Sequence, residues 1–251
     1  MSNQWYDVDT LQWVDTPTYE WGFSLDVNQL NQIFTDNNFV YAATVSGLDI
    51  VSIETELSYS FTPYGDGYST VWASDDNVYL GTASGGIKRL TKEHISSGDL
   101  SSYIEDYVSV PDLTSNNVRY IHGNDTKLIC CTNYGVDIIR RDNSYITHTY
   151  GINVTKCFVT PKHDYYYYIS YDGDESSINR LNQNISDWTD PDVVYTIGHT
   201  FLSDITDIND ICVTEHTSLV GDNNTIFLAT DLGALIYDEG SLNRLLIANK
   251  L

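Results

Sequence analysis

The sequence predicts an all-β fold, arranged as a β-propeller of five four-stranded antiparallel blades. The main observation is a phrase that occurs five times: an apolar run, then Thr or Ser, then two residues, then Gly. Successive copies are 38, 50, 38 and 60 residues apart, and the mean of about 46 matches one propeller blade. Twenty tyrosines among 251 residues also favour strands. The repeat residues are Thr44 and Gly47, Thr82 and Gly85, Thr132 and Gly135, Ser170 and Gly173, and Thr230 and Gly233.

Each repeat begins with a short apolar strand, which we expect to be the innermost strand of its blade. These strands are 32–35, 70–73, 119–122, 157–160 and 210–214. A turn rich in Asn and Asp follows, because these residues tolerate left-handed angles and bond their own backbone. The turns are 36–38, 75–77, 124–125, 163–164 and 222–224.

The apolar run itself is the second strand, apolar on both faces because both faces pack on neighbouring blades. The Gly of the phrase supplies the turn into a third strand. Third strands are predicted at 48–53, 87–90, 136–139, 178–181 and 234–237, and outer strands at 57–62, 103–110, 145–150 and 193–197. Residues 182–191 and 215–221 are extra and are assigned to surface loops.

The whole chain, 1–251, is predicted to be one domain. The expected blades are 28–67, 68–113, 114–153, 154–204 and 205–251. An open first or last blade would leave an exposed edge, so the ring must be closed. We expect residues 1–27 to close it by completing the last blade beside the C-terminal run 242–247.

The repeated phrase resembles the propeller repeats of the two-component-regulator type and their WD-like relatives. The resemblance covers roughly 30–238, with a degraded fourth copy in which Ser170 replaces Thr and polar residues 175–177 follow the Gly. It implies a propeller fold and assigns no activity.

The charge is strongly acidic: 12 Lys and Arg face 35 Asp and Glu, a net charge of −23. Such a surface repels nucleic-acid backbones and anionic membranes, so both are excluded as partners. The first residues carry no secretory segment, and no apolar stretch is long enough to span a bilayer, which predicts synthesis in the cytoplasm without a signal peptide. The four cysteines lack zinc-type spacing and are expected to be buried thiols: Cys130, Cys131, Cys157 and Cys212.

Four acidic residues near the ends of the inner strands are the candidate catalytic groups. Some five-bladed propellers are glycosidases that use carboxylates from neighbouring inner strands. The candidates here are Asp36, Asp75, Asp125 and Glu215. The same positions are those at which Asn and Asp form turns, so the sequence favours a structural role and a protein that is not an enzyme.

A short acidic run is the candidate metal site. Asp172 and Asp174 flank Gly173, as in part of a calcium loop, but the distant bidentate Glu of such a loop is missing. An acidic turn that at most collects a divalent cation adventitiously is favoured, and no cofactor is predicted.

The favoured function is a non-enzymatic structural or interaction propeller, an accessory component (decoration, collar or tail) of a large assembly such as a bacteriophage virion. Its partners would be capsid or tail proteins with a basic docking surface. One alternative is a glycan-binding or glycoside-hydrolysing propeller, with Trp72 near Asp75, or Trp188 near Asp187 and Asp190, as sugar contacts. Another is an intracellular protein–protein adaptor.

Overall fold

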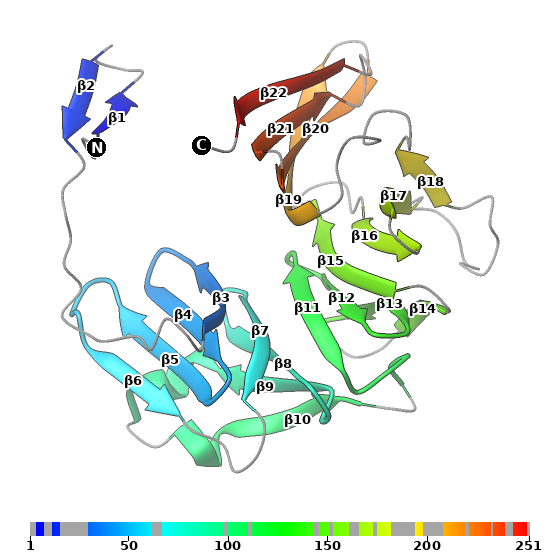
Figure 1. Cartoon of the computed structure of the whole chain (residues 1–251). Coiled ribbons are helices and arrows are strands. Elements are labelled where there is room, and N and C mark those ends of the chain that lie inside the picture. Colours follow the sequence, from blue (N-terminus) through cyan, green and yellow to red (C-terminus); the bar gives the residue numbers. More distant parts are fainter. Residues whose placement is uncertain are drawn as a thin grey trace.

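The computed structural model describes fifteen segments of the chain. They are residues 4–7, 12–15, 30–61, 67–97, 100–109, 112–142, 146–150, 153–160, 166–172, 175–181, 194–197, 208–218, 221–231, 233–238 and 243–249. Within them, the chain forms five four-stranded antiparallel sheets and one two-stranded hairpin (Figure 1). The predicted all-β fold with four-stranded antiparallel sheets is therefore confirmed.

The five sheets follow one another in the sequence, and we number them accordingly. The first sheet contains β3 (Leu30–Thr35), β4 (Phe39–Thr44), β5 (Gly47–Ser52) and β6 (Ser58–Phe61). The second contains β7 (Tyr68–Ala73), β8 (Asn77–Thr82), β9 (Ile87–Thr91) and β10 (Ile104–Val108). The third contains β11 (Val118–Gly123), β12 (Lys127–Thr132), β13 (Gly135–Arg140) and β14 (Ile146–Tyr150). The fourth contains β15 (Asn153–Val159), β16 (Tyr166–Asp172), β17 (Glu175–Leu181) and β18 (Val194–Ile197). The fifth contains β19 (Ile208–Ser218), β20 (Gly221–Thr230), β21 (Gly233–Asp238) and β22 (Asn243–Asn249).

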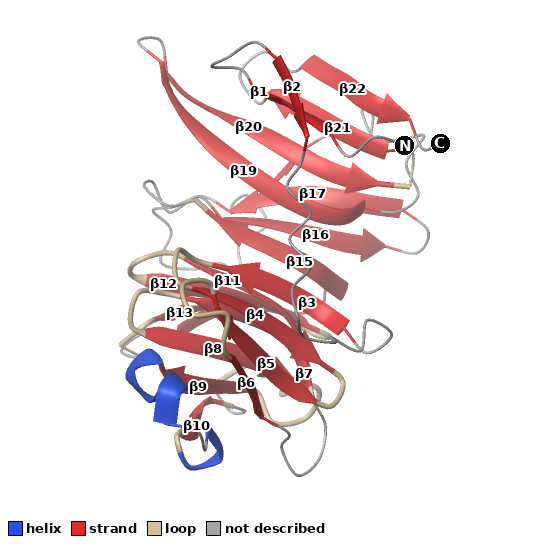
Figure 2. Cartoon of the chain, turned by 90° about the vertical axis from the view of Figure 1, so that its left-hand side faces the viewer, coloured by secondary structure: helices blue, strands red, loops and turns tan. Residues whose placement is uncertain are grey.

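Each sheet is a meander in which consecutive strands pair. The first strands of successive sheets, β3, β7, β11, β15 and β19, contact one another in that order. The sheets therefore follow each other along an arc with their first strands on the inside, a propeller-like arrangement (Figures 1 and 2).

Side chains bond the inner strands to one another across the gaps between sheets. Gln32 Oε1 of β3 accepts the Val71 N–H of β7 at 3.0 Å and also the Thr70 hydroxyl. Thr70 Oγ1 in turn accepts the Ile121 N–H of β11 at 3.0 Å, and His122 Nδ1 accepts the Val159 N–H of β15 at 3.3 Å. These bonds pair backbone N–H groups of β7, β11 and β15 with side chains of the preceding sheet.

The apolar core lies between successive sheets rather than in one central mass. One buried cluster joins the first and second sheets, a second joins the second and third, a third joins the third and fourth, and a fourth joins the fourth and fifth. This layering explains why the apolar runs show no polar alternation, since both of their faces are covered.

The Thr of the repeated phrase closes the turn between the second and third strands. Thr44 Oγ1 accepts the Gly47 N–H at 2.9 Å and donates to the Gly47 carbonyl at 3.1 Å. Thr132 and Thr230 likewise donate to the carbonyls of the glycines three residues later, at 3.2 and 2.8 Å. The hydroxyl thus replaces ladder bonds that the reversing backbone cannot make.

In the second copy this turn is one residue longer than the repeated phrase suggests. Thr82 Oγ1 accepts the Gly85 N–H at 2.7 Å, but it donates to the Gly86 carbonyl at 2.9 Å. Gly86 also has φ of 76°, a left-handed value that suits glycine. The turn glycine is therefore Gly86, and Gly85 lies within the loop.

Two linkers are bonded to the turn of the sheet that they leave. The Gly67 N–H, just before β7, donates to the Val45 carbonyl in the β4–β5 turn at 3.1 Å. The Asn116 carbonyl, just before β11, accepts the Gly86 N–H of the β8–β9 turn at 3.0 Å. These bonds fix where the next sheet starts.

The structure differs from the sequence prediction between the first and second strands of the fifth repeat. Residues 215–221 were expected in a loop and 222–224 in a turn, but β19 and β20 continue through this region, with Glu215 opposite Asn224 and Thr217 opposite Asp222. Two short 3₁₀ helices, η2 (Lys92–Ser97) and η3 (Leu100–Ser102), also lie between β9 and β10. Neither these nor any other helix in the described segments is long and apolar enough to cross a membrane.

The N-terminal segment forms a unit of its own. β1 (Gln4–Asp7) pairs with β2 (Gln12–Asp15), and the fifth sheet takes its fourth strand, β22, from the C-terminal run. In the described residues the fifth sheet is thus complete without the N-terminal segment, and the expected pairing of the two ends is not among its strand pairs.

Candidate functional site

Three of the four candidate acids come together at one pocket. Asp36, Asp75 and Asp125 lie in the β3–β4, β7–β8 and β11–β12 turns and line a pocket of about 270 Å³. Trp72, Ser74, Lys92 and Asn124 complete much of its wall. The pocket therefore lies at the end of the inner strands where the first, second and third sheets meet.

Asp36 is fully occupied by structural hydrogen bonds. Its Oδ1 accepts the N–H groups of Asn38 at 2.7 Å and Phe39 at 2.8 Å, and its Oδ2 accepts the Tyr41 hydroxyl at 2.9 Å. Lys92 of η2 forms an ion pair with the same Oδ2. Burial raises the pKa of Asp36, but the hydrogen bonds from Lys92, Asn38, Phe39 and Tyr41 outweigh it and lower the pKa below the ordinary value.

These contacts make Asp36 unsuitable as a catalytic acid, because a general acid needs a raised pKa at neutral pH. The hydrogen-bonded turn cap recurs in the next two sheets with other residues. Ser74 Oγ accepts the Asn77 N–H at 3.1 Å. Asn124 Oδ1 accepts the N–H groups of Thr126 at 3.1 Å and Lys127 at 3.0 Å.

Asp75 and Asp125 each lie one position after these caps, at the exposed tips of their turns. At the tip of the β11–β12 turn, the Asp125 backbone carbonyl accepts Arg141 Nη1 at 2.6 Å. The two exposed carboxylates face the same pocket, which makes this end of the inner strands a polar, acidic surface.

The remaining candidates do not join this group. The backbone of Glu215 lies inside the long strand β19, paired with Asn224. Asp172 ends β16 and pairs with Glu175, whereas Gly173 and Asp174 lie outside the described residues. Across the described part of the chain, no three His, Cys, Asp or Glu side chains are grouped as metal ligands would be.

A ladder of rings runs along the inner strands beneath the pocket; the repeat relates its members, although only Trp72 among them is predicted as a contact residue. Phe34 of β3 and Trp72 of β7 have ring centroids 6.2 Å apart, and Trp72 and His122 of β11 are 6.4 Å apart. His122 stacks on Phe158 of β15 at 4.0 Å. These residues occupy equivalent positions in four successive repeats, so the ladder is a packing feature that joins the sheets.

Trp72 is part of this ladder and is only 6% exposed. It also stacks on Tyr79, with centroids 5.8 Å apart. It therefore presents little ring surface to a sugar, which requires an accessible aromatic face. The other proposed aromatic contact, Trp188 with Asp187 and Asp190, lies outside the described residues.

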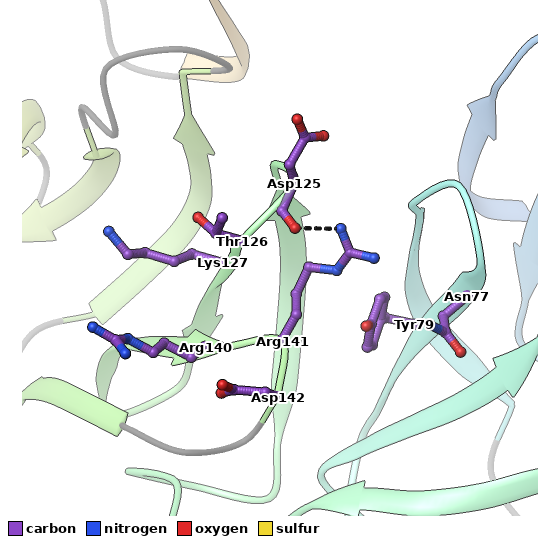
Figure 3. A pocket seen from close by; sticks show the side chains of 8 residues that line it. All are labelled: Asn77, Tyr79, Asp125, Thr126, Lys127, Arg140, Arg141 and Asp142. Carbon is purple, nitrogen blue, oxygen red and sulfur yellow. Dashed lines mark hydrogen bonds between the residues drawn. The ribbon is translucent and has the colours of Figure 1, made fainter.

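A second pocket of about 560 Å³ lies between the second and third sheets (Figure 3). Arg141 extends from its floor toward Asp125 and Tyr79, whereas Lys127 and Arg140 point to the other side of the β12–β13 hairpin. The Lys127 ammonium lies 5.6 Å from the centre of the Tyr166 ring. The three cations that border this pocket are therefore not convergent, as an anion site would require.

Buried polar groups of the third sheet serve packing rather than chemistry. Asp137 of β13 is fully buried and accepts the Thr114 N–H at 3.0 Å and the Thr114 hydroxyl at 2.7 Å. That hydroxyl also bonds the repeat residue Thr132 at 2.6 Å. Burial, with Asp137 nearby, raises the pKa of the Cys130 thiol well above its ordinary value, which keeps it protonated and unreactive.

The cysteines are not all buried, contrary to expectation. Cys130, Cys131 and Cys157 are buried free thiols, but Cys212 of β19 is an exposed free thiol. Its exposure follows from its place on the face of the fifth sheet that points away from the fourth, since its strand partner is the exposed Phe227.

With the all-β, propeller-like class established, comparison with known proteins identifies similar folds. No protein-family model matches the sequence. The comparison with curated proteins finds no match either. The extracellular domain of a protein described as the one component system BT4673 from B. thetaiotaomicron matches 95% of this chain, with a TM-score of 0.61 and 15% identity.

Two further solved structures are also similar to this chain in fold. PorZ, a bacterial surface component of the type-IX secretion system of Porphyromonas gingivalis, matches 88% of this chain with a TM-score of 0.61 and 14% identity. A second structure of the BT4673 extracellular domain, described as a hybrid two component system, matches 91% with a TM-score of 0.56 and 12% identity. The present chain spans 31%, 28% and 29% of these three chains. At such identities the likeness concerns the fold alone.

Proposed function

We propose that the chain is a five-bladed propeller that acts as a non-enzymatic interaction module, each sheet being one blade of a ring that the N-terminal segment closes. The observation that carries the proposal is the use of Asp36 as a turn cap whose two carboxylate oxygens accept four hydrogen bonds. The acids that a glycosidase would need as a matched pair instead hold, or project from, the turns of a rigid surface.

The surface proposed for binding is the acidic end of the inner strands. Asp75 and Asp125 are exposed there on two neighbouring turns, and the whole chain carries a net charge of −23. A basic protein surface is the complementary partner, because opposite potentials speed encounter and fix orientation. The solved neighbours include extracellular and surface domains; their likeness concerns the fold and gives no support to a bacteriophage role.

The assembly that the chain belongs to stays a prediction. If it is a virion component, it will co-purify with particles at a fixed copy number after density-gradient separation. Absence from particles, together with capture in a stable complex of cellular proteins, would instead favour the adaptor alternative.

Catalysis is tested directly with a panel of aryl glycosides and polysaccharides. We expect no hydrolysis above that of buffer by the wild-type protein. Hydrolysis that disappears in Asp75→Asn and Asp125→Asn, but not in the exposed control Asp106→Asn of β10, would overturn the non-enzymatic proposal.

Glycan binding without hydrolysis is the second candidate, favoured by the 270 Å³ pocket that carboxylates and amides line. Such groups bond sugar hydroxyls even where no ring face is offered. Binding on a glycan array that is lost in Asp75→Asn and retained in Asp106→Asn would support it. Equal binding by the two variants would place the glycan elsewhere.

A further inference from the structure

The internal repeat shows which face of each sheet receives the next sheet. The residue three positions before the repeat Thr or Ser lies in the core shared with the following sheet. In the first four repeats it is buried: Tyr41 is 0% exposed, Tyr79 1%, Ile129 0% and Tyr167 0%. In the fifth repeat it is Phe227, which is 37% exposed. Among the described residues, no sheet covers this face of the fifth sheet.

The opposite end of the array has the same property. Ile33 of β3 pairs with Ala42, on the face of the first sheet that points away from the second. Its equivalents in later repeats are covered by the preceding sheet: Val71 is 0% exposed, Ile121 0%, Cys157 0% and Ile211 4%. Ile33 is 50% exposed. Within the described part of the chain, both ends of the five-sheet array therefore lack the neighbouring sheet that every internal interface has.

The exposed face of the fifth sheet, which we call the end face, carries an apolar patch. Strand pairing places Cys212, Phe227 and Ile236 in one row across β19, β20 and β21, and Asp210, Ala229 and Ala234 in the next. Cys212, Phe227, Ala229 and Ala234 are exposed. Because the equivalent faces of the other four sheets form the established inter-sheet cores, the end face is built to be covered.

The N-terminal hairpin β1–β2 has the properties of the missing neighbour. Its register pairs Trp5 with Val14 and Tyr6 with Trp13, so large apolar residue types occupy both alternating sets of positions, as in a strand pair covered on both sides. A lone two-stranded hairpin is marginally stable in water and needs a partner surface.

The hairpin can also reach the end face. Residues 16–29 connect it to the first sheet, and 14 residues span up to roughly 46 Å when extended. Figure 1 shows the hairpin on the side of the molecule that lies between the fifth and first sheets, and Figure 2 shows it at the level of the fifth sheet.

We propose that the hairpin β1–β2 docks as a sixth, two-stranded unit between the fifth and first sheets, covering the end face on one side and Ile33 on the other. It closes the ring as a separate layer and not as an added strand of the fifth sheet, which already has four. The inference rests on the ring closure proposed above, and it is independent of what the ring binds, because its test involves neither glycan nor partner.

Cys212 provides the test, because it lies on the end face while the other three cysteines are buried. The full chain is treated with a maleimide under native conditions, and labelling at each cysteine is followed by mass spectrometry. We expect slow labelling of Cys212 in the wild-type protein. Labelling should be at least about tenfold faster in the Trp5→Asp, Trp13→Asp double variant, in which two buried charges would prevent docking.

The controls keep the result interpretable. Cys130, Cys131 and Cys157 should stay unlabelled in the double variant, which shows that the five sheets remain folded. Tyr134→Asp, a change at a 61% exposed residue of the β12–β13 turn, should leave Cys212 as protected as in the wild type. Labelling of Cys212 at the same fast rate in the wild-type protein and the double variant would overturn the proposal.

A second copy of the chain is the rival occupant. In that case light scattering would show a dimer, and protection of Cys212 would fall as the protein is diluted, which would overturn docking within one chain. Protection that is independent of concentration in a monomer supports it. The double variant should match the wild-type protein in the hydrolysis and glycan-binding assays. A negative labelling result would therefore contradict the docking of the hairpin without contradicting the proposed function.

Discussion

At the scale of single residues, the repeat threonines show why a hydroxyl recurs at the end of each apolar run. Thr82 makes two bonds of 2.7 and 2.9 Å to backbone groups of a tight turn while being only 6% exposed. Without the hydroxyl, buried N–H and carbonyl groups of the turn would be left unpaired, which costs more than the bonds themselves contribute.

Thr82→Val, which keeps the shape and removes the hydroxyl, should lower the free energy of unfolding by about 1–3 kcal/mol. Urea unfolding followed by circular dichroism measures this. Thr55→Val is the control, because Thr55 is exposed and makes a single long contact of 3.5 Å to the Leu57 N–H; its effect should stay within about 0.5 kcal/mol. Equal effects of the two changes would contradict the assigned role.

Asp36→Asn should lower stability although it changes only one atom of the side chain. The amide cannot pair with the Lys92 charge, which is only 12% exposed, so we expect a loss of about 1–3 kcal/mol at pH 7. Asp75→Asn at the exposed neighbouring turn should change it by less than about 0.5 kcal/mol. Because folding lowers the pKa of Asp36, the stability that its carboxylate contributes should be lost as the pH falls through that pKa. The unfolding free energies of Asp36→Asn and Asp75→Asn should then approach that of the wild-type protein.

His122 is a neutral base held within the ladder of rings, and this links stability to pH. Burial against its neighbouring rings lowers its pKa from 6.5 to about 3, and its Nδ1 must stay unprotonated to accept the Val159 N–H. The unfolded chain therefore binds a proton below pH 6.5 that the folded chain does not, so the wild-type protein loses stability as pH falls from 6.5 toward 3.

His122→Gln keeps an acceptor and removes the titrating group. Between pH 7.5 and pH 5, the free energy of unfolding should fall by about 2 kcal/mol more in the wild-type protein than in His122→Gln. Urea titrations at the two pH values measure it. A difference that is constant with pH would show that His122 titrates normally in the folded protein.

At the scale of elements, local patterns predict the strands well and fail where long-range pairing decides. The inner strands and apolar runs lie within a few residues of their predicted positions, because periodicity and turn residues are local signals. Residues 222–224 have the composition of a turn but are strand, since they pair with residues 215–217 of β19. The role of Asp36 as a turn residue is readable from sequence; its bond to Lys92, 56 residues away, is not.

The β8–β9 turn tests the assignment of its two adjacent glycines. Gly86→Ala would require a left-handed alanine whose Cβ clashes with the Val108 carbonyl oxygen, so we expect a loss of at least about 2 kcal/mol. Gly85→Ala places Cβ 3.2 Å from the Thr82 hydroxyl and otherwise near the Lys88 side chain, and should cost less than about 1 kcal/mol. Thermal unfolding compares the stability of the two variants. A larger loss in Gly85→Ala would show that Gly85 is the turn glycine.

At the scale of the whole molecule, the negative charge works against the compact state. A net charge of −23 produces repulsion that folding concentrates. The ion pairs Lys88–Asp106 and Arg89–Glu105 join partly exposed side chains of β9 and β10 and offset little of this repulsion, since exposed pairs contribute about 0–1 kcal/mol.

Salt should therefore stabilise the protein. Between about 10 mM and 1 M NaCl the Debye length falls from about 30 Å to about 3 Å, and we expect Tm to rise by several degrees, about 2–4 °C for each kcal/mol of repulsion removed. The Glu54→Lys, Asp76→Lys variant, with two exposed charges reversed, should show a smaller rise. A Tm that falls with salt would mean that surface ion pairs outweigh the repulsion.

The bonds between linkers and preceding turns have a consequence for how the protein forms during synthesis. The segment that begins the second sheet is tied to the turn of the first by the Gly67 N–H, and the segment that begins the third is tied to the turn of the second at Asn116. The first and second sheets thus each provide a formed turn against which the start of the next sheet is fixed. A ribosome that delivers the chain from its N-terminus can add the sheets one after another, without waiting for the C-terminal residues to emerge.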